Sequence, residues 1–176
     1  DTLVEYGVGA VGLAALAAAR GRYQTFAVDL QASRLEAAVR LGATAINPAE
    51  SEDLVAQIKE LTNGHGANFA IDTTGKTAVV KQMVQALAIK GTAVILALGD
   101  ATAELDAVDV MMNGKQIVGA IMGDSDPHQT IPELLRMAAA GEFMVDDLIT
   151  AYPVAQINEA IADAESGKVI KPVLVW

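Results

Sequence analysis

Hydrophobic and polar residues follow two alternating patterns along this chain. Short apolar runs predict buried strands at residues 2–6, 25–28, 44–46, 68–72, 92–98, 116–122 and 171–175. Helical spacing of apolar residues predicts helices at residues 10–20, 33–41, 51–62, 76–88, 106–112, 132–140 and 154–165. Because strand-like and helix-like segments alternate with short loops, the pattern predicts a parallel α/β sheet.

A glycine-rich turn separates the first predicted strand from the first predicted helix. Its sequence is Gly7-Val8-Gly9-Ala10-Val11-Gly12. Gly7 would make the tight turn, Gly9 would let the backbone approach a diphosphate, and Gly12 would let the helix lie close to the strand. The diphosphate would sit on the open N–H groups at the helix start. An incidental glycine-rich turn need not stand between a strand and a helix, as this one does. We therefore expect a Rossmann fold, which is a doubly wound, six-stranded parallel sheet with helices on both faces.

An acidic residue stands where a dinucleotide's ribose would lie. Asp29 ends the second predicted strand, seventeen residues after Gly12. Its carboxylate would accept hydrogen bonds from the adenosine ribose hydroxyls, and its charge would repel a 2′-phosphate. The expected cofactor is therefore NAD rather than NADP.

Composition and charge narrow the function classes. Of the 176 residues, 52% are hydrophobic but only 4% are aromatic, which suits parallel strands buried on both faces. A net charge of −10 argues against nucleic-acid and anionic-membrane partners. The absence of cysteine excludes disulfides and thiolate metal sites within these residues. With no basic leader and no apolar run longer than residues 13–19, we expect a cytoplasmic protein.

Recognisable motifs extend along nearly the whole chain and are not confined to the glycine turn. They lie at residues 7–13, 28–29 with Arg34, 40–44, 46–47, 72–75, 91–99, 119–123 and 166–172. Leu41-Gly42-Ala43-Thr44 and the stretch from Ser166 to Pro172 are the most specific. Together these motifs resemble the nicotinamide-binding half of the zinc-dependent medium-chain alcohol dehydrogenases, and most of all the members that oxidise aromatic or other hydrophobic primary alcohols.

The resemblance also implies what the chain lacks. Family members carry an N-terminal catalytic domain whose Cys and His residues hold zinc, and hydride passes from a zinc-bound alkoxide to the nicotinamide. Here only His65 and His128 are present, in dissimilar loops, so no such zinc site is expected. We therefore expect residues 1–141 to form an NAD-binding domain, and residues 142–176 to pack in relatives with the missing catalytic domain. This fragment alone is expected to be inactive.

Individual cofactor contacts are implied by the same resemblance. Val11 would pack under the nicotinamide ring, and Arg34 would lie over the adenosine ribose unless it is an ordinary solvated cation. The carbonyls of Leu96 and Ala120 and the N–H of Met122 would hold the carboxamide. The whole expected set is Gly7, Gly9, Ala10, Val11, Gly12, Asp29, Arg34, Thr73, Thr74, Leu96, Ala97, Leu98, Ala120, Met122 and Lys171.

Lys171 would neutralise the diphosphate, unless the tail is displaced without the missing domain. Met111 and Met112 are expected in core or interface packing. His65 is expected to be a loop residue, and His128 to lie at a helix start. Glu5 is unexpected, because a central strand should be apolar.

The last strand of the predicted sheet bears on how the chain assembles. The apolar, proline-free strand at residues 116–122 should lie at the sheet edge, where family members pair two subunits, so we expect a homodimer. A monomer, with this strand capped by the helix at residues 132–140, is the alternative. Two other functions stay open: a stand-alone NAD-sensing module, and the cofactor domain of a zinc-free quinone or enoyl reductase.

Overall fold

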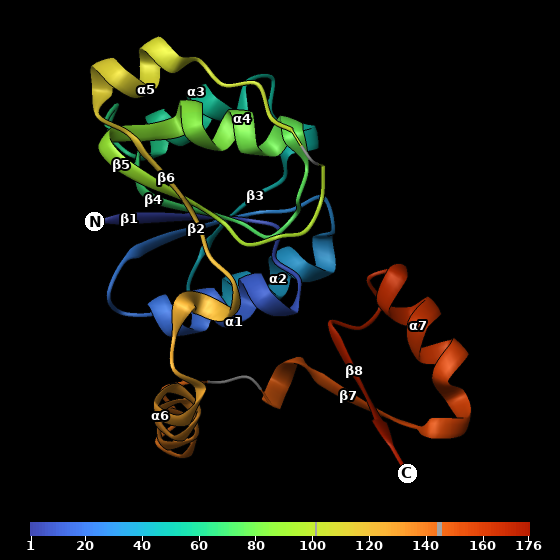
Figure 1. Cartoon of the computed structure of the whole chain (residues 1–176). Coiled ribbons are helices and arrows are strands. Elements are labelled where there is room, and N and C mark those ends of the chain that lie inside the picture. The colour runs from blue at the N-terminus through green and yellow to red at the C-terminus, as the bar shows by residue number, and fades with distance from the viewer. Residues whose placement is uncertain (101, 144–145) are drawn as a thin grey trace.

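A six-stranded parallel sheet forms the centre of the molecule. The computed structural model describes residues 1–100, 102–143 and 146–176. The strands run in the order β3-β2-β1-β4-β5-β6, which confirms the predicted doubly wound fold (Figure 1). Their bounds are β1 (Thr2–Tyr6), β2 (Gln24–Val28), β3 (Thr44–Ile46), β4 (Ala67–Asp72), β5 (Leu87–Ile95) and β6 (Gln116–Gly119).

Helices cover both faces of this sheet. One face carries α1 (Ala10–Ala19) and α2 (Ala32–Arg40), and the opposite face carries α3 (Leu54–Leu61) and α4 (Thr77–Ala86) (Figure 1). Next along the chain come α5 (Ala107–Asn113), on the α4 side, and α6 (Pro127–Ala139) after β6. The strand order reverses between β1 and β4, so the loops after β1 and β4 diverge at the carboxyl edge, where such sheets bind ligands.

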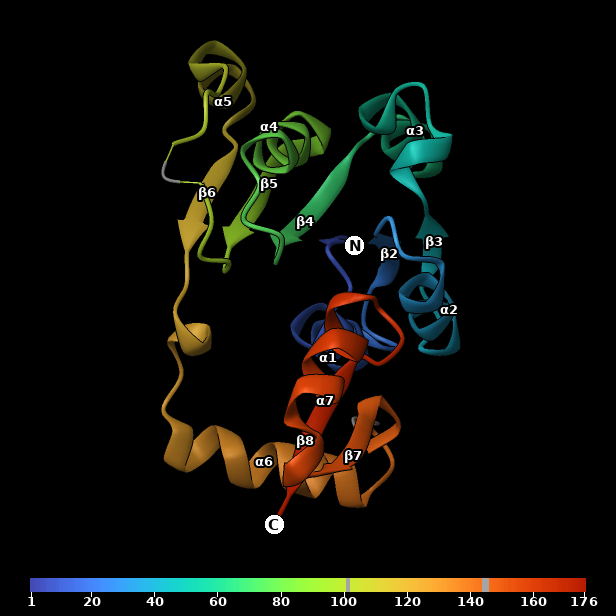
Figure 2. The same cartoon turned by 90° about the vertical axis from the view of Figure 1, so that its right-hand side faces the viewer.

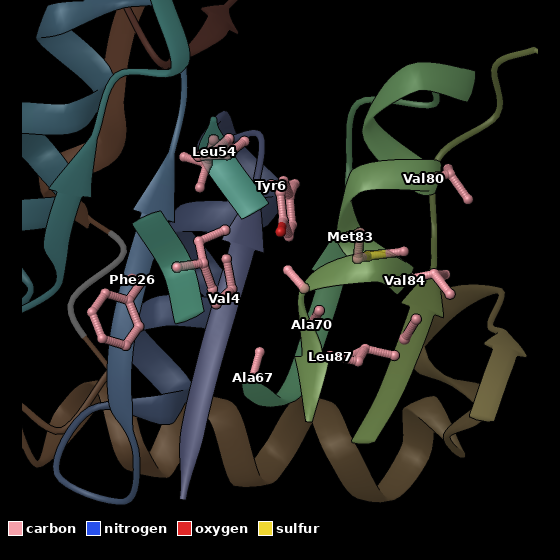
Figure 3. Close-up of a cluster of buried hydrophobic side chains, with 14 of the residues drawn as sticks. Val4, Tyr6, Phe26, Leu54, Ala67, Ala70, Val80, Met83, Val84 and Leu87 are labelled. Carbon is pink, nitrogen blue, oxygen red and sulfur yellow. The ribbon is translucent and has the colours of Figure 1, made fainter. Parts of the chain in front are cut away.

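Two apolar cores separate the sheet from its helices. The core on the α3 and α4 side contains Val4, Tyr6 and Met83 (Figure 3). The core on the α1 and α2 side contains Leu13 and Leu16. Strand β1 contributes Val4 and Tyr6 to the first core, and side chains alternate along a strand, so Leu3 and Glu5, which are also buried, point to the other face.

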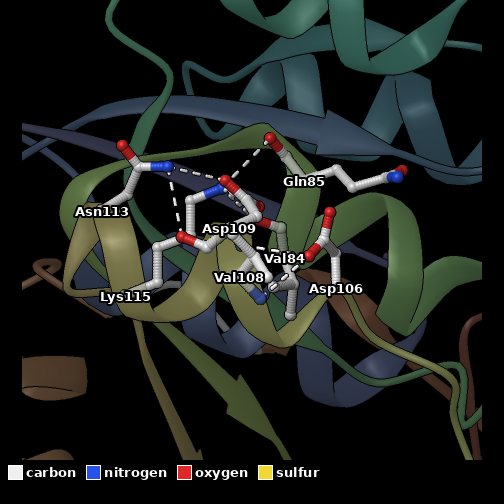
Figure 4. Close-up of polar contacts among 7 residues, drawn as sticks. All are labelled: Val84, Gln85, Asp106, Val108, Asp109, Asn113 and Lys115. Carbon is white, nitrogen blue, oxygen red and sulfur yellow. Dashed lines mark hydrogen bonds and ion pairs between the residues drawn. The ribbon is translucent and has the colours of Figure 1, made fainter.

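A buried lysine ties α4 to α5. The Lys115 ammonium donates hydrogen bonds to the carbonyl of Val84 at 2.9 Å and to the Asp109 carboxylate at 2.7 Å (Figure 4). A longer bond of 3.5 Å reaches the Gln85 carbonyl. The hydrogen bond from Lys115 to the Asp109 carboxylate holds the pKa of Asp109 below its ordinary value. Lys115 thereby adds a donor to carbonyls in the last turn of α4, where the Val84 carbonyl also accepts the Leu87 N–H.

The C-terminal segment builds its own small sheet. Strands β7 (Ile149–Pro153) and β8 (Lys171–Val175) pair in parallel, and α7 (Ile157–Glu165) connects them (Figure 2). The segment contacts the main body at α2, where the Ser33 hydroxyl donates to the Gly167 carbonyl at 2.9 Å. Leu148 also joins the core on the α1 and α2 side. The proposed division at residue 141 stays a prediction.

Several predicted element ends are wrong because tertiary contacts decide them. Ser33 does not cap α2, which begins at Ala32 after Gln31, because its hydroxyl is bonded to Gly167. The predicted helix at 76–88 ends at Ala86, and β5 begins at Leu87, since Leu87 pairs with Ala67 of β4.

The edge strand and the helix after it also differ from the prediction. Strand β6 ends at Gly119, and Met122 lies in a short 3-10 turn with a φ of 52°. Helix α6 begins at Pro127 rather than at Pro132, because the Asp126 carboxylate caps it by accepting the His128 N–H at 3.0 Å. Strand β7 was not predicted. Within the described residues, no helix is long and apolar enough to cross a bilayer.

Candidate functional site

A cavity of about 600 Å³ opens at the carboxyl edge of the sheet. It is formed where the loops after β1, β2, β4 and β5 meet. Ten of the predicted cofactor-binding residues line it: Gly7, Gly9, Ala10, Val11, Asp29, Arg34, Thr73, Thr74, Leu96 and Ala97. The topology therefore brings together residues that lie up to ninety positions apart in the sequence (7 to 97).

The glycine turn has the geometry that its motif predicts. Gly7 has a φ of 88°, and a Cβ there would lie 2.8 Å from the Thr73 hydroxyl oxygen. A Cβ at Gly12 would collide with the Gly7 carbonyl oxygen, so α1 packs directly on the turn. Gly9 has open space around its missing Cβ. The turn thus needs glycine for packing at positions 7 and 12, whereas Gly9 lines the cavity with open space where its Cβ would lie.

The first turn of α1 has no side-chain cap. Gly9 is its N-cap and supplies no side-chain hydrogen bond, and the first turn holds no acidic residue. Ala10 and Val11 line the cavity at this end. Uncapped N–H groups and the positive end of the helix dipole favour a phosphate oxygen here.

Asp29 is fixed beside this turn by backbone hydrogen bonds. One carboxylate oxygen accepts the Val8 N–H at 2.9 Å, and the other accepts the Gln31 N–H at 2.8 Å. Arg34 Nη1 lies 3.7 Å from the first oxygen. Only 8% of the Asp29 side chain is exposed. Because Asp29 also lines the cavity, its carboxylate forms part of the cavity wall. Each oxygen keeps a lone pair for a further donor.

The end of β4 is fastened to the glycine turn. The Thr73 hydroxyl donates to the Gly7 carbonyl at 2.5 Å, and has a second contact of 3.2 Å with the Tyr6 carbonyl. The buried Asp72 carboxylate accepts from the Thr74 N–H at 2.9 Å and from its hydroxyl at 2.6 Å. These bonds hold the two loops that flank the strand-order reversal in one position.

A buried carboxyl lies beneath the glycine turn. Glu5 of β1 is fully buried, and neither carboxyl oxygen has a hydrogen-bond partner. Its Oε1 lies 3.0 Å from the point that a Cβ on Gly12 would occupy. Burial raises the pKa of Glu5 well above its ordinary value, and the nearby charge of Asp72 raises it further, while the adjacent Thr73 hydroxyl lowers it.

The remaining predicted residues lie outside the cavity lining. Gly12 is buried under the turn, and the Leu98 side chain is fully exposed. Ala120 follows β6 next to Leu96, since Ile95 pairs with Gly119, whereas Met122 is 80% exposed. Lys171 is an exposed residue at the start of β8.

Sequence reasoning missed an apolar wall of the cavity. Leu30, Pro48, Leu54 and Val79 line it, together with Gln82 and Lys76. Leu54 belongs to α3 and Val79 to α4, whereas Leu30 follows β2. Leu54 was predicted on the apolar face of its helix, which indicates burial but cannot tell a core from a cavity wall. The one sequence signal for this apolar wall was the position of Leu30, directly after Asp29.

Other singled-out residues form no second site. His65 and His128 are exposed. In the described ranges, no three His, Cys, Asp or Glu side chains are grouped as metal ligands. Met111 and Met112 are 69% and 73% exposed, so they are not core residues, and their place in an interface stays a prediction.

Known proteins share this sequence and fold. The family described as zinc-binding dehydrogenase matches residues 7–140. A geraniol dehydrogenase from Castellaniella defragrans is 38% identical over 100% of this chain and 48% of its own length. The crystal structure of benzyl alcohol dehydrogenase from Acinetobacter calcoaceticus superposes with a TM-score of 0.92 at 40% identity, over 98% of this chain and 49% of that one.

A less similar dehydrogenase also matches most of this chain. An (R,R)-butanediol dehydrogenase from Bacillus subtilis is 32% identical over 85% of this chain and 42% of its own length. This chain spans about half the length of the curated relatives it matches, and it corresponds to their cofactor-binding half. With the fold, the glycine turn and the family match in agreement, the chain belongs to the zinc-binding dehydrogenase family.

Proposed function

We propose that this chain binds NAD in the cavity at the carboxyl edge and holds its nicotinamide for hydride transfer from an alcohol. The observation that carries the proposal is the pairing of an uncapped α1 with a fixed Asp29. The α1 end favours a diphosphate, and the lone pairs of Asp29 suit two ribose hydroxyls. A 2′-phosphate would bring a second negative charge against this carboxylate.

The ends of β5 and β6 suit the nicotinamide, together with Val11 in the first turn of α1. Val11 and Leu96 line the cavity, and Ala120 follows the neighbouring strand end. These residues would bind the ring and its carboxamide, and so decide which ring face meets the substrate. When bound, the nicotinamide supplies the hydride acceptor. The chain's own contribution is binding and orientation.

Zinc does not fit the residues of this chain. The chain has no cysteine, and the described ranges contain no cluster of metal-ligating side chains. We therefore assign no metal-dependent step to these residues, and propose that the zinc of the parent enzyme is held by its catalytic domain. The names of the geraniol and benzyl alcohol relatives support a hydrophobic alcohol as substrate.

We further propose that the chain pairs with a second copy through β6, in the cytoplasm. This strand lies at the sheet edge, and its four residues are exposed. Ile117 and Val118 give it apolar side chains with 38% and 41% exposure. Unpaired backbone groups at such an edge favour pairing with another strand.

Calorimetric titration with NAD and NADP tests the cofactor proposal. The wild type should bind NAD more tightly by about 2 kcal/mol, or roughly thirtyfold, the size of an unsatisfied contact with a charged group. Asp29→Ala should narrow this gap. Glu36→Ala is the matched control, because it removes an exposed carboxylate on α2 that does not line the cavity. Equal affinity for both cofactors, or tighter binding of NADP, would contradict the proposal.

A further inference from the structure

A loop clasp, made by hydrogen bonds among Gly75, Thr77, Asp100 and Thr102, joins the loop that follows β5 to the start of α4. The Thr77 N–H donates to the Asp100 carboxylate at 3.0 Å, and the Asp100 N–H donates to the Gly75 carbonyl at 2.9 Å. The Thr77 hydroxyl lies 3.1 Å from the same carboxylate oxygen and 2.7 Å from the Thr102 carbonyl. Its single hydrogen therefore has two acceptors on this loop.

Two glycines bring the loops after β4 and β5 into direct contact at the clasp. A Cβ on Gly99 would collide with the Gly75 carbonyl, and a Cβ on Gly75 would lie 2.8 Å from the Gly99 Cα. The two backbones thus meet without a side chain between them. Because of this contact, the position of one loop constrains the position of the other.

Asp100 provides a cap that α4 does not obtain from its own N-cap residue. That residue is Lys76, whose side chain makes no capping hydrogen bond. The Asp100 carboxylate accepts the Thr77 N–H instead, at the positive end of the helix dipole. The hydrogen bonds from the Thr77 N–H and hydroxyl hold the pKa of Asp100 below its ordinary value, so this exposed carboxylate is ionised at neutral pH. The clasp is therefore a charge-assisted contact.

The two loops differ in how firmly the rest of the fold holds them. The loop after β4 is fixed independently, because the buried Asp72 carboxylate accepts hydrogen bonds from Thr74 and Gly75. In the loop after β5, the Leu96 N–H donates to the Asp72 carbonyl at 3.1 Å, and the next bond along the described chain is that of the Asp100 N–H. The described residues 97–99 make no hydrogen bond between these two points. Their position therefore depends on the clasp.

We propose that Asp100 is a positioning residue for the nicotinamide: through the loop clasp it holds Leu96 and Ala97 on the cavity lining, without lining the cavity itself. This inference rests on the proposed function, which assigns the nicotinamide to the ends of β5 and β6. Without the clasp, NAD binding must also order this loop, which costs binding free energy. The diphosphate and ribose contacts at α1 and Asp29 belong to other loops and should keep their strength.

Calorimetric titrations of the 176-residue chain with NAD and with ADP-ribose test the proposal, because ADP-ribose is NAD without its nicotinamide. In Asp100→Ala, the Kd for NAD should rise about fivefold, the size of one lost hydrogen bond, while the Kd for ADP-ribose stays unchanged. Asp100→Asn, whose amide oxygen can still accept from Thr77, should restore most of the NAD affinity. Thr77→Val, which removes only the hydroxyl bond, should show the same split at smaller size.

Glu104→Ala is the matched control, because it removes an exposed carboxylate four residues further along the same loop. Both of its Kd values should equal those of the wild type. An unchanged NAD affinity in Asp100→Ala, or equal losses for NAD and ADP-ribose, would overturn the proposal. If the wild type does not bind NAD, the proposed function fails, and amide hydrogen exchange without ligand still decides whether Asp100 holds the loop. Exchange at Leu96 should then be faster in Asp100→Ala, and an unchanged rate would overturn the clasp.

Discussion

Replacing Lys115 with methionine should destabilise the junction between α4 and α5 by about 3 kcal/mol. The lysine side chain is only 4% exposed and makes two short charged hydrogen bonds, each worth roughly 1.5–3 kcal/mol. Methionine keeps the aliphatic stem but removes the ammonium donor from the Val84 carbonyl, which then keeps only the Leu87 N–H. Asp109, with a 27% exposed side chain, regains some hydration, so the expected loss is below the sum of the two bonds.

Thermal and urea unfolding of Lys115→Met measure this loss. For a chain of this size, about 3 kcal/mol corresponds to a Tm lower by roughly 6–12 °C. Because the pKa of Asp109 is lowered in the folded chain, its pairing stabilises above the ordinary carboxyl pKa and is lost as pH falls through the folded value. The difference between wild type and variant should therefore shrink in acid.

A matched control uses an exposed lysine on the neighbouring helix. Lys81→Met on α4 removes the same charge at an exposed position, and should change stability by less than about 0.5 kcal/mol. A loss below about 1 kcal/mol in Lys115→Met, or a loss that does not depend on pH, would refute the reasoning.

Three further predictions concern the turn, the edge strand and catalysis. Gly12→Ala should destabilise the fold by about 1–3 kcal/mol in urea unfolding, because its Cβ would meet the Gly7 carbonyl. Gly9→Ala should leave stability unchanged but weaken NAD binding at least about tenfold by calorimetry; equal effects of the two variants on stability would contradict this contrast. Light scattering should show a wild-type dimer that Val118→Lys converts to a monomer, and a monomeric wild type would rule out pairing through β6. The pure chain should produce no NADH from benzyl alcohol or ethanol, with or without added zinc, and detectable turnover would contradict the account of its chemistry.

The sheet could be predicted from the sequence because each buried strand is itself a short run of mostly apolar residues. Each central strand is a short apolar run, and the bounds of β3 and β8 match their predicted ranges. The glycine turn and Asp29 were also predictable, because their roles depend on neighbouring residues in one βα unit. Strand β7 was missed because it has mostly exposed residues, and its pairing partner β8 lies far along the chain.

Contacts between distant residues account for the other failures. Ser33 has the chemistry of a helix cap, yet its hydroxyl is used by Gly167, which is 134 positions away. Leu87 has helical spacing with α4, but pairing with Ala67 places it in β5. The cavity's apolar wall, including Leu54 and Val79, was not predictable because burial in a core and exposure to a ligand cavity leave the same sequence pattern.

Amide NMR spectra recorded during an NAD titration show whether NAD binds on the glycine turn. The amide signals of Gly9, Ala10 and Val11 should shift as the cofactor occupies the end of α1, together with that of Leu30 on the cavity wall. Signals from β7 and β8 serve as the internal reference and should stay in place. Unchanged signals at Gly9 to Val11 at saturating NAD, or shifts confined to other parts of the chain, would contradict the account.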